Sequence, residues 1–439
     1  MKQSIIGALT KYQMLMNGIS HSSLKLKSII LKPIIMLVYL SSFYFPVQAT
    51  EVLTLGVLGV DSNQRYSYDW ITRKFEKHHP NVKIKTIAYS DEQFKQKIEG
   101  WFANKAGPDV ITWQGGERLY QFIRRGLIKP IDTFWQVNAL DDEFDLKAIN
   151  AVSLNNSKYG LPISYYNWGF YYRKSVFLDL KLHPPKTWQE LLDICETLQN
   201  AGILPITIGT KNPWTASAWF SYITMRLYGI EYYYALIQGE TSYIDPKAKK
   251  IFEMWKVMLD ANYFLRDHQQ YDWNEIMPSL FRNISGMTLI GNFFIADIPD
   301  ALIDDFGYFN FPKMDPEVPR FELAPLDLLM IPSYSKNTKL AEKFLLFMSN
   351  QDVQSDLNEK FQMLPTNINA HIQGDYFTKV ALTSLLSSKG NSQFFDRDTT
   401  AKTYNAVLPL FVEFMNHKDV TKITTKLEQL RLEGVFDHK

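Results

Sequence analysis

The sequence predicts an α/β protein that folds into two lobes, and three observations lead to this prediction. The chain has 439 residues, which exceeds the length at which a single hydrophobic core stops growing. Hydrophobic residues make up 46% of the chain and charged residues 21%, a composition typical of folded globular proteins. From residue 51 onward, short apolar runs alternate with segments of helical periodicity, a pattern typical of mostly parallel sheets flanked by helices.

The first lobe is predicted from an alternation of strand and helix that starts at Glu51. The run 52–58 is continuously apolar, as expected for a parallel strand that is buried on both faces. Further on, Asp91 is placed to cap a helix. The predicted strands are 52–58, 82–85 and 110–113, and the helices that follow them contain Phe75, Phe94 and Phe122, with the last helix ending at Gly126.

The second lobe is predicted to begin after residues 160–162, a Gly-Leu-Pro sequence. Thr187 and Glu190 have the spacing of a capping box, so a helix is expected to begin there and to end at Gly202. The other predicted elements are strands at 170–172, 205–208, 286–290, 306–311 and 326–331, a mostly helical stretch at 214–260, and helices from Leu340 onward.

The first 49 residues predict a secretory signal peptide. Three lysines between residues 25 and 32 precede an apolar stretch at 34–45, and Val-Gln-Ala at 47–49 satisfies the small-residue rule for signal peptidase. A transmembrane anchor is the alternative, but the stretch is short and two serines interrupt it. We therefore expect cleavage after Ala49 and a periplasmic mature protein. Because no cysteine stands at the cleavage point, we expect no lipid anchor.

Charge and motif content argue against several classes of function. The formal net charge is +1, which gives no electrostatic reason to expect a nucleic-acid partner. The metalloprotease, Gly-x-Ser-x-Gly and phosphate-binding loop patterns are absent, so we expect no enzyme, no metal and no cofactor. A secreted glycosidase stays an alternative, because a pair of carboxylates is easily found among 46 acidic residues. The only cysteine, Cys195, lies in a helical pattern and is expected to be a buried core residue.

Five segments, in order along the chain, resemble the family 1 extracellular solute-binding proteins, a group that binds carbohydrates. Residues 159–174 resemble the first crossover between the lobes of that family, and residues 286–293 resemble the second. The other matching segments are 184–191, 200–206 together with Trp214 and 218–220, and 395–398. The similarity extends from about residue 52 to past residue 410.

The resemblance implies a two-lobed periplasmic-binding-protein fold of type II, in which a hinge of crossing segments lets the lobes close over the ligand. It also implies a monomer that binds a sugar or oligosaccharide and delivers it to the membrane permease of an ABC importer. A sensor kinase or a chemoreceptor is the alternative partner for the same fold. The implied division is 1–49 signal peptide, 50–167 and 292–332 N-lobe, and 168–291 and 333–439 C-lobe.

The predicted binding residues combine aromatic rings with polar side chains near the hinge and at strand ends. A sugar offers hydroxyl groups that need directional hydrogen bonds and apolar faces that pack flat on aromatic rings. Open α/β sheets bind ligands beyond the carboxyl ends of their strands. Three predictions have alternatives: Trp219 as a core residue, Asp327 as a hinge partner and Arg397 as part of a helix cap. The predicted residues are Asp61, Gln114, Tyr165, Tyr166, Trp168, Trp214, Trp219, Asn292, Phe293, Asp327 and Arg397.

Overall fold

The structure is a computed structural model, and it describes residues 50–59, 62–372 and 374–436. The predicted signal peptide and Asp61 lie outside these residues. None of the described helices is long and apolar enough to cross a membrane. The described chain contains two larger sheets, and we call each sheet with the helices packed on it a lobe. The α/β fold class predicted from the sequence is confirmed.

The N-lobe is built on a six-stranded sheet with the order β13-β6-β12-β3-β1-β2. The interior strand β1 buries one face fully through Leu53, Leu55 and Val57, whereas Thr54 on its other face is only partly buried. It pairs in parallel with β2 and β3, whereas β12 runs antiparallel to both β3 and β6. The strands are β1 (Glu51–Leu58), β2 (Val82–Tyr89), β3 (Val110–Gln114), β6 (Gly160–Tyr165), β12 (Leu326–Met330) and β13 (Leu364–Pro365).

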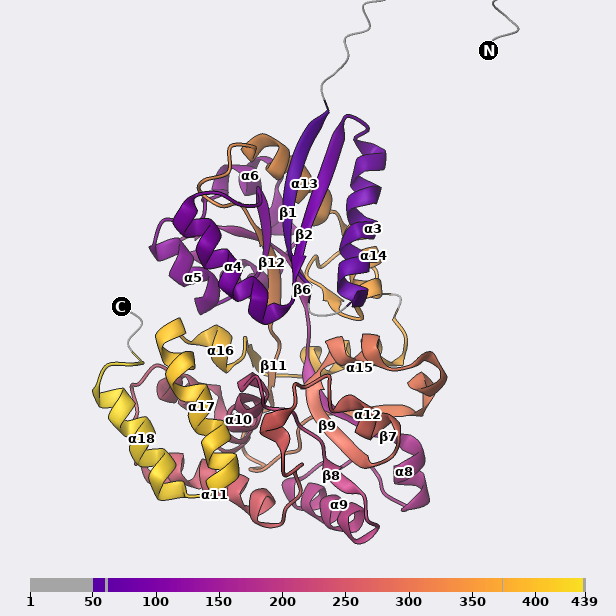
Figure 1. Cartoon of the computed structure of the whole chain (residues 1–439), viewed down its shortest axis with the longest axis vertical. Helices are drawn as coiled ribbons and strands as arrows, with labels where there is room; N and C mark the ends of the chain where they lie inside the picture. The colour runs from indigo at the N-terminus through magenta and orange to yellow at the C-terminus, as the bar shows by residue number, and fades with distance from the viewer. Residues whose placement is uncertain (1–49, 60–61, 373, 437–439) are drawn as a thin grey trace, which may run out of the picture. The chain divides into compact units, whose positions relative to one another are not determined.

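Helices from distant parts of the chain cover the N-lobe sheet. The helix α4 buries Phe94, Ile98 and Phe102, which recur at helical spacing and face β1 and β2. Figure 1 shows α3 and α14 side by side, although more than 270 residues separate their starts. The helices are α3 (Ser62–His78), α4 (Asp91–Asn104), α5 (Glu117–Arg124), α6 (Asp132–Val137), α7 (Leu146–Ala151), α13 (Thr338–Ser349) and α14 (Gln351–Phe361).

The C-lobe is built on a four-stranded sheet with the order β10-β7-β9-β8. Every residue of β7 and β9 is buried, because α8, α9 and α12 pack against this sheet. The predicted capping box at the start of α9 is confirmed: the Thr187 hydroxyl accepts from the Glu190 amide, and the Glu190 carboxylate accepts from the Thr187 amide. These elements are β7 (Trp168–Arg173), β8 (Leu204–Ile206), β9 (Ser285–Gly291), β10 (Phe306–Phe309), α8 (Lys174–Asp179), α9 (Trp188–Asn200) and α12 (Met277–Phe281).

A group of helices completes the C-lobe around α10. This helix is buried on most of its circumference, and α11, α16 and α17 pack on it, while α18 packs on α11 and α17 (Figure 1). The short strands β11 and β14 pair in parallel beside it. The elements are α10 (Trp214–Ile237), α11 (Pro246–Asp260), α15 (Tyr376–Leu386), α16 (Phe395–Asp398), α17 (Ala401–His417), α18 (Val420–Leu432), β11 (Phe321–Leu323) and β14 (Gly390–Ser392).

The structure differs from the predicted division of the chain in two segments. Residues 292–323 were assigned to the N-lobe, but β10 pairs antiparallel with β7 and therefore belongs to the C-lobe sheet. Residues 333–365 were assigned to the C-lobe, but α13 packs on β6 and α14 packs on α3, so they belong to the N-lobe. The second crossover is therefore Ala324–Pro325, between β11 and β12, and not the segment after β9.

In the described part of the chain, three crossovers connect the lobes. They explain why each sheet contains both parallel and antiparallel strand pairs and is not mostly parallel. The first joins β6 to β7 through Tyr166 and Asn167, the second is Ala324–Pro325, and the third lies between β13 and α15. The Tyr166 amide donates to the Pro325 carbonyl at 3.1 Å, so the first two crossovers lie side by side. Because β12 returns from the C-lobe while β6 leaves the N-lobe, the two strands must run in opposite directions.

Candidate ligand-binding site

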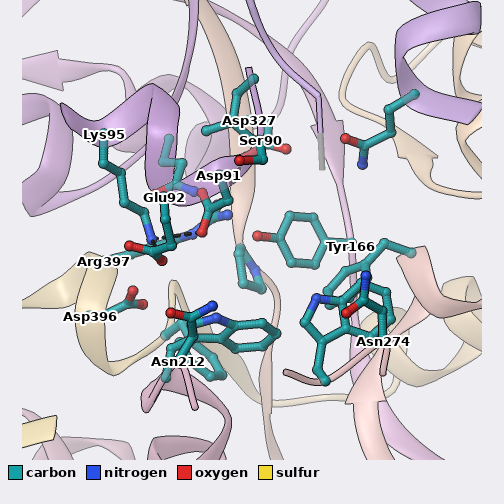
Figure 2. A pocket seen from close by; sticks show the side chains of 18 of the residues that line it. Ser90, Asp91, Glu92, Lys95, Tyr166, Asn212, Asn274, Asp327, Asp396 and Arg397 are labelled. Atoms are coloured by element: carbon teal, nitrogen blue, oxygen red, sulfur yellow. Dashed lines mark hydrogen bonds and ion pairs between the residues drawn. The ribbon is translucent and has the colours of Figure 1, made fainter. Parts of the chain in front are cut away.

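A cavity of about 240 Å³ lies where the first two crossovers meet. Tyr166 and Trp168 line it from the first crossover and the start of β7, and Pro325 lines it from the second. The N-lobe contributes the first turn of α4 and the ends of β3 and β12, and the C-lobe contributes α16 and two loops around residues 212–214 and 272–274. Both lobes therefore contribute side chains to one cavity (Figure 2).

Aromatic rings form one wall of the cavity. The Trp168 ring stacks on Phe394 with 4.6 Å between ring centroids, and the Trp214 ring meets Trp168 edge-on at 5.8 Å. Phe293 contacts Trp273 edge-on at 5.2 Å. Such offset and edge-on pairs hold rings in fixed positions while leaving other faces for a ligand. The wall is mostly apolar, and the apolar face of a ligand can pack on it.

Phe394 adopts backbone angles of φ 114° and ψ 150°, a conformation that a bulky residue rarely takes. Strained backbone of this kind persists only where the surrounding structure holds it in place. Here the stack on Trp168 holds the ring, and the Phe394 carbonyl accepts from the amides of Arg397 and Asp398 in the short helix α16. Phe394 and the α16 residues Asp396 and Arg397 line the cavity next to this strained position.

Charged residues of α4 form the opposite part of the cavity. The Lys95 ammonium lies 2.7 Å from Asp91 Oδ2 and 2.9 Å from Glu92 Oε1, so one cation serves two carboxylates (Figure 2). Burial acts to raise the pKa of Asp91, but the Lys95 ammonium outweighs it and holds that pKa below its ordinary value. Both acids also lie in the first helical turn, where the helix dipole stabilises negative charge.

Two ion pairs connect α16 of the C-lobe to the N-lobe. Arg397 Nη1 lies 3.0 Å from Asp327 Oδ1 on β12, and Arg118 Nη2 of α5 lies 2.5 Å from Asp396 Oδ2. The arginine is on the C-lobe in the first pair and on the N-lobe in the second. Burial raises the pKa of the Asp327 carboxyl above its ordinary value, although Arg397 offsets part of this effect. We call these two pairs the crossed ion pairs.

Several buried polar atoms at the cavity have no hydrogen-bond partner among the described residues. They include Gln114 Oε1 at the end of β3 and Trp168 Nε1, on side chains that are 5% and 2% exposed. Asp91 Oδ1 beside them is also without a partner. Buried polar groups are normally satisfied, and each exception calls for an explanation. A polar ligand in the cavity explains these exceptions, because it can donate a hydrogen bond to Gln114 Oε1 and accept one from Trp168 Nε1.

Seven of the predicted binding residues line the cavity: Gln114, Tyr166, Trp168, Trp214, Phe293, Asp327 and Arg397. Tyr165, Trp219 and Asn292 do not. Trp219 is fully buried against Phe170, Phe264 and Phe311 in the C-lobe core. The Tyr165 hydroxyl donates a hydrogen bond to the Asp145 carboxylate, and the Asn292 side-chain amide donates one to the Gln362 main-chain carbonyl. The structure favours the alternative interpretation of Trp219 as a core residue. Tyr165 and Asn292 form hydrogen bonds within the protein.

Some lining residues were not predicted from the sequence. Asp91 was identified only as a helix cap, although it follows the end of β2 and so had the same strand-end signal as Gln114. Asn212, Asp272 and Trp273 lie on two loops that the Thr210–His268 contact joins, with 2.6 Å between the Thr210 hydroxyl oxygen and His268 Nδ1. A contact between loops 58 residues apart leaves no local signal.

The pH dependence of the free energy of unfolding tests the burial of Asp398 in α16. Asp398 accepts hydrogen bonds from the Ser392 hydroxyl at 2.6 Å and from the Gln393 amide at 3.0 Å, and burial raises the pKa of its carboxyl to about 6. Because the folded pKa is higher than the unfolded one, the contribution of Asp398 to stability is present below about pH 4 and is lost as the pH rises through about 6. Asp398→Asn should remove this loss.

Urea unfolding of the wild type and Asp398→Asn at several pH values checks this expectation. The variant should gain stability relative to the wild type between about pH 4 and pH 7. Parallel pH profiles for the two proteins would contradict the raised pKa.

Two α/β lobes, three crossovers and a cavity lined from both lobes define a two-lobed ligand-binding protein. Comparison with known protein families agrees with this class. Residues 61–355 match the family described as bacterial extracellular solute-binding protein. The chain belongs to this family, as its resemblance to the family 1 proteins predicted.

Individual relatives are distant. The chain is 25% identical over 310 residues, or 67% of either chain, to an uncharacterized ABC transporter extracellular-binding protein of Pyrococcus horikoshii. Among solved structures, it is similar to a bacterial solute receptor described as having an exclusive preference for β-D-galactopyranose, with a TM-score of 0.83, 21% identity, and 88% of this chain and 100% of the other covered. A chitin oligosaccharide binding protein gives a TM-score of 0.80 at 19% identity, with 88% and 99% covered. These similarities establish the fold.

Proposed function

We propose that this protein is the extracytoplasmic receptor of an ABC importer and that it binds a carbohydrate in the cavity at the crossovers. The observation that carries the proposal is the pairing of an aromatic wall with buried polar atoms that have no protein partner. A sugar needs both features, because its hydroxyl groups and its apolar faces lie on the same ring. The solved relatives described as receptors for galactopyranose and chitin oligosaccharides support this ligand class.

The size of the cavity favours a short ligand. Its volume of about 240 Å³ is below the roughly 300–1,000 Å³ that is typical of small-molecule pockets. One or two sugar rings fit this space better than a long oligosaccharide. The ligand is therefore proposed to be a monosaccharide or a disaccharide.

Lobe closure is the proposed mechanism. A ligand that contacts both lobes at once stabilises the closed form, and the difference in its affinity for the open and closed forms sets how far the population shifts. The permease is proposed to recognise the closed form and to receive the sugar unchanged. A sensor kinase or a chemoreceptor would use the same closure, and genes for permease subunits beside this one would favour transport.

The test is a thermal-shift screen of the chain from Thr50 onward against monosaccharides, disaccharides, polyols, amino acids and polyamines, followed by calorimetry. A ligand at one hundred times its dissociation constant should add about 2.7 kcal/mol to the free energy of unfolding. We expect at least one sugar to raise the melting temperature and to be recovered intact. A sugar that is hydrolysed would instead establish the glycosidase alternative, and a shift only with amino acids or polyamines would exclude sugar as the ligand.

A further inference from the structure

The charged side chains of the cavity are predominantly acidic. Among the described residues that line it, Lys95 and Arg397 are the cations. Five of the lining residues carry carboxylates: Asp91, Glu92, Asp272, Asp327 and Asp396. This imbalance is local, because the whole chain has 47 basic and 46 acidic side chains. The described lining of the cavity therefore carries an excess of acidic over basic side chains that the composition does not show.

Most of these carboxylates have a cationic partner. Asp327 pairs with Arg397, and Asp396 pairs with Arg118 behind the cavity wall. Asp91 and Glu92 share Lys95, which leaves them with one positive charge for two negative charges.

Asp272 differs from the other four carboxylates because both of its hydrogen-bond donors are neutral. The Asn212 amide donates to Asp272 Oδ2 at 2.6 Å, and the Trp273 main-chain amide donates to Oδ1 at 3.0 Å. Among the described residues, no lysine, arginine or histidine nitrogen lies within 4.0 Å of its carboxylate. The donors fix the orientation of the carboxylate but do not neutralise it.

The surroundings of Asp272 also suit a cation. Trp273 is the next residue and lines the cavity together with Trp214 from the facing loop. The faces of indole rings carry negative potential and attract ammonium groups. A carboxylate without a cationic partner among the described residues, in a cavity that two tryptophans also line, is an arrangement that binds a positively charged group.

We propose that the ligand of this cavity is a sugar that carries a protonated amino group, and that the Asp272 carboxylate binds this group. The inference rests on the sugar-binding function proposed above and names the chemical class of the sugar. Uronic acids and sugar phosphates are disfavoured, since their negative charge would lie among the unbalanced carboxylates. The buried acceptor Gln114 Oε1 and the donor Trp168 Nε1 then serve the hydroxyl groups of the same ring.

The test uses matched sugars that share one ring stereochemistry and differ from the neutral parent at one charged substituent. Calorimetry at about pH 6, where an aliphatic amine is protonated, compares glucose, glucosamine and glucuronate, and then the corresponding galactose and mannose series. We expect the amine of one series to bind at least about tenfold more tightly than its neutral parent, and the acid to bind at least about tenfold more weakly. A neutral parent that binds as tightly as its amine would overturn the inference while leaving sugar binding intact. Failure of every sugar in the three series and in the thermal-shift screen would overturn both.

Two variants test the role of Asp272. Asp272→Asn should lower the ratio of amine affinity to neutral-sugar affinity by about tenfold, since the neutral amide cannot offset the charge of the ligand. Asp267→Asn is the matched control, because Asp267 is exposed, lies on the same loop and does not line the cavity. The ratio should not change in this control. If the ratio of amine affinity to neutral-sugar affinity is the same in Asp272→Asn as in the wild type, the assignment to Asp272 is overturned. The comparison of sugars in the wild type does not depend on whether either variant folds.

Discussion

Trp214→Ala is expected to raise the dissociation constant of the bound sugar by at least about tenfold, equivalent to about 1.4 kcal/mol. Trp214 is partly exposed, begins α10 and lines the cavity, where its ring meets Trp168 edge-on at 5.8 Å. Removing the ring removes an apolar face on which a sugar can pack, together with the desolvated area it provides. Calorimetry of the variant with the sugar identified by thermal shift gives the change directly.

Trp70→Ala is the control for this prediction. Trp70 is also partly exposed and lies on α3, away from the cavity, where the ammonium groups of Lys74 and Lys360 contact its ring. Its replacement should leave the dissociation constant of the sugar unchanged. If Trp214→Ala and Trp70→Ala bind the sugar equally well, Trp214 is not a stacking surface for the ligand.

Trp168 is a poorer choice for such a test, although it also lines the cavity. It is only 2% exposed, and Phe394 already stacks on its ring. Its main-chain carbonyl accepts hydrogen bonds from the hydroxyl groups of Tyr222 and Tyr308. Replacing a buried tryptophan by alanine typically costs about 3–5 kcal/mol of stability, so a loss of binding in Trp168→Ala would have two possible causes.

The elements predicted from the sequence are those whose signals are local. The continuous apolar run of β1, the capping box of α9 and the glycines at φ 68° and 75° after α5 and α9 depend on residues a few positions apart. Each of these signals reports on the conformation of its own segment. None reports on which sheet a strand joins.

The assignment of strands to lobes was wrong where it depended on long-range pairing. Residues 306–309 have the composition of a strand in either lobe, and only their antiparallel pairing with β7, more than 130 residues earlier in the chain, assigns them to the C-lobe. The antiparallel direction of β12 also depends on a distant part of the chain, because it follows from the return of the chain through the second crossover. Side-chain periodicity specifies which faces of a strand are buried, but it does not specify the neighbouring strand.

The structure places the predicted aromatic residues of the first crossover at one cavity, whereas of the two tryptophans predicted in α10 only Trp214 lines it. Tyr166 and Trp168 lie close to Gly and Pro residues at the first crossover, where a hinge constrains position. Trp214 and Trp219 are five residues apart on one helix that is apolar on nearly every face, so periodicity could not separate the ring at the cavity from the ring in the core.

Arg118→Met is expected to lower the free energy of unfolding by about 3–5 kcal/mol, because it leaves the Asp396 carboxylate buried without its cation. Arg118 is 2% exposed, its Nε donates to the Asp396 main-chain carbonyl at 2.8 Å, and its guanidinium lies 4.5 Å from the centre of the Tyr404 ring. The matched control is Arg125→Met, which breaks a pair with Glu99 whose side chains are 47% and 50% exposed. Exposed pairs contribute about 0–1 kcal/mol, so this control should unfold almost like the wild type.

The double variant Arg118→Met/Asp396→Leu separates the cost of an unpaired charge from the worth of the pair. If the loss in Arg118→Met comes from the unpaired carboxylate, the double variant should recover most of it, as measured by urea unfolding. Equal stability of Arg118→Met and Arg125→Met would show that the pair is not buried in solution. Arg118 belongs to the N-lobe and Asp396 lines the cavity from the C-lobe, so this pair, like the Asp327–Arg397 pair, joins the two lobes. The crossed ion pairs therefore help to hold the two lobes in the arrangement that brings their side chains to one cavity.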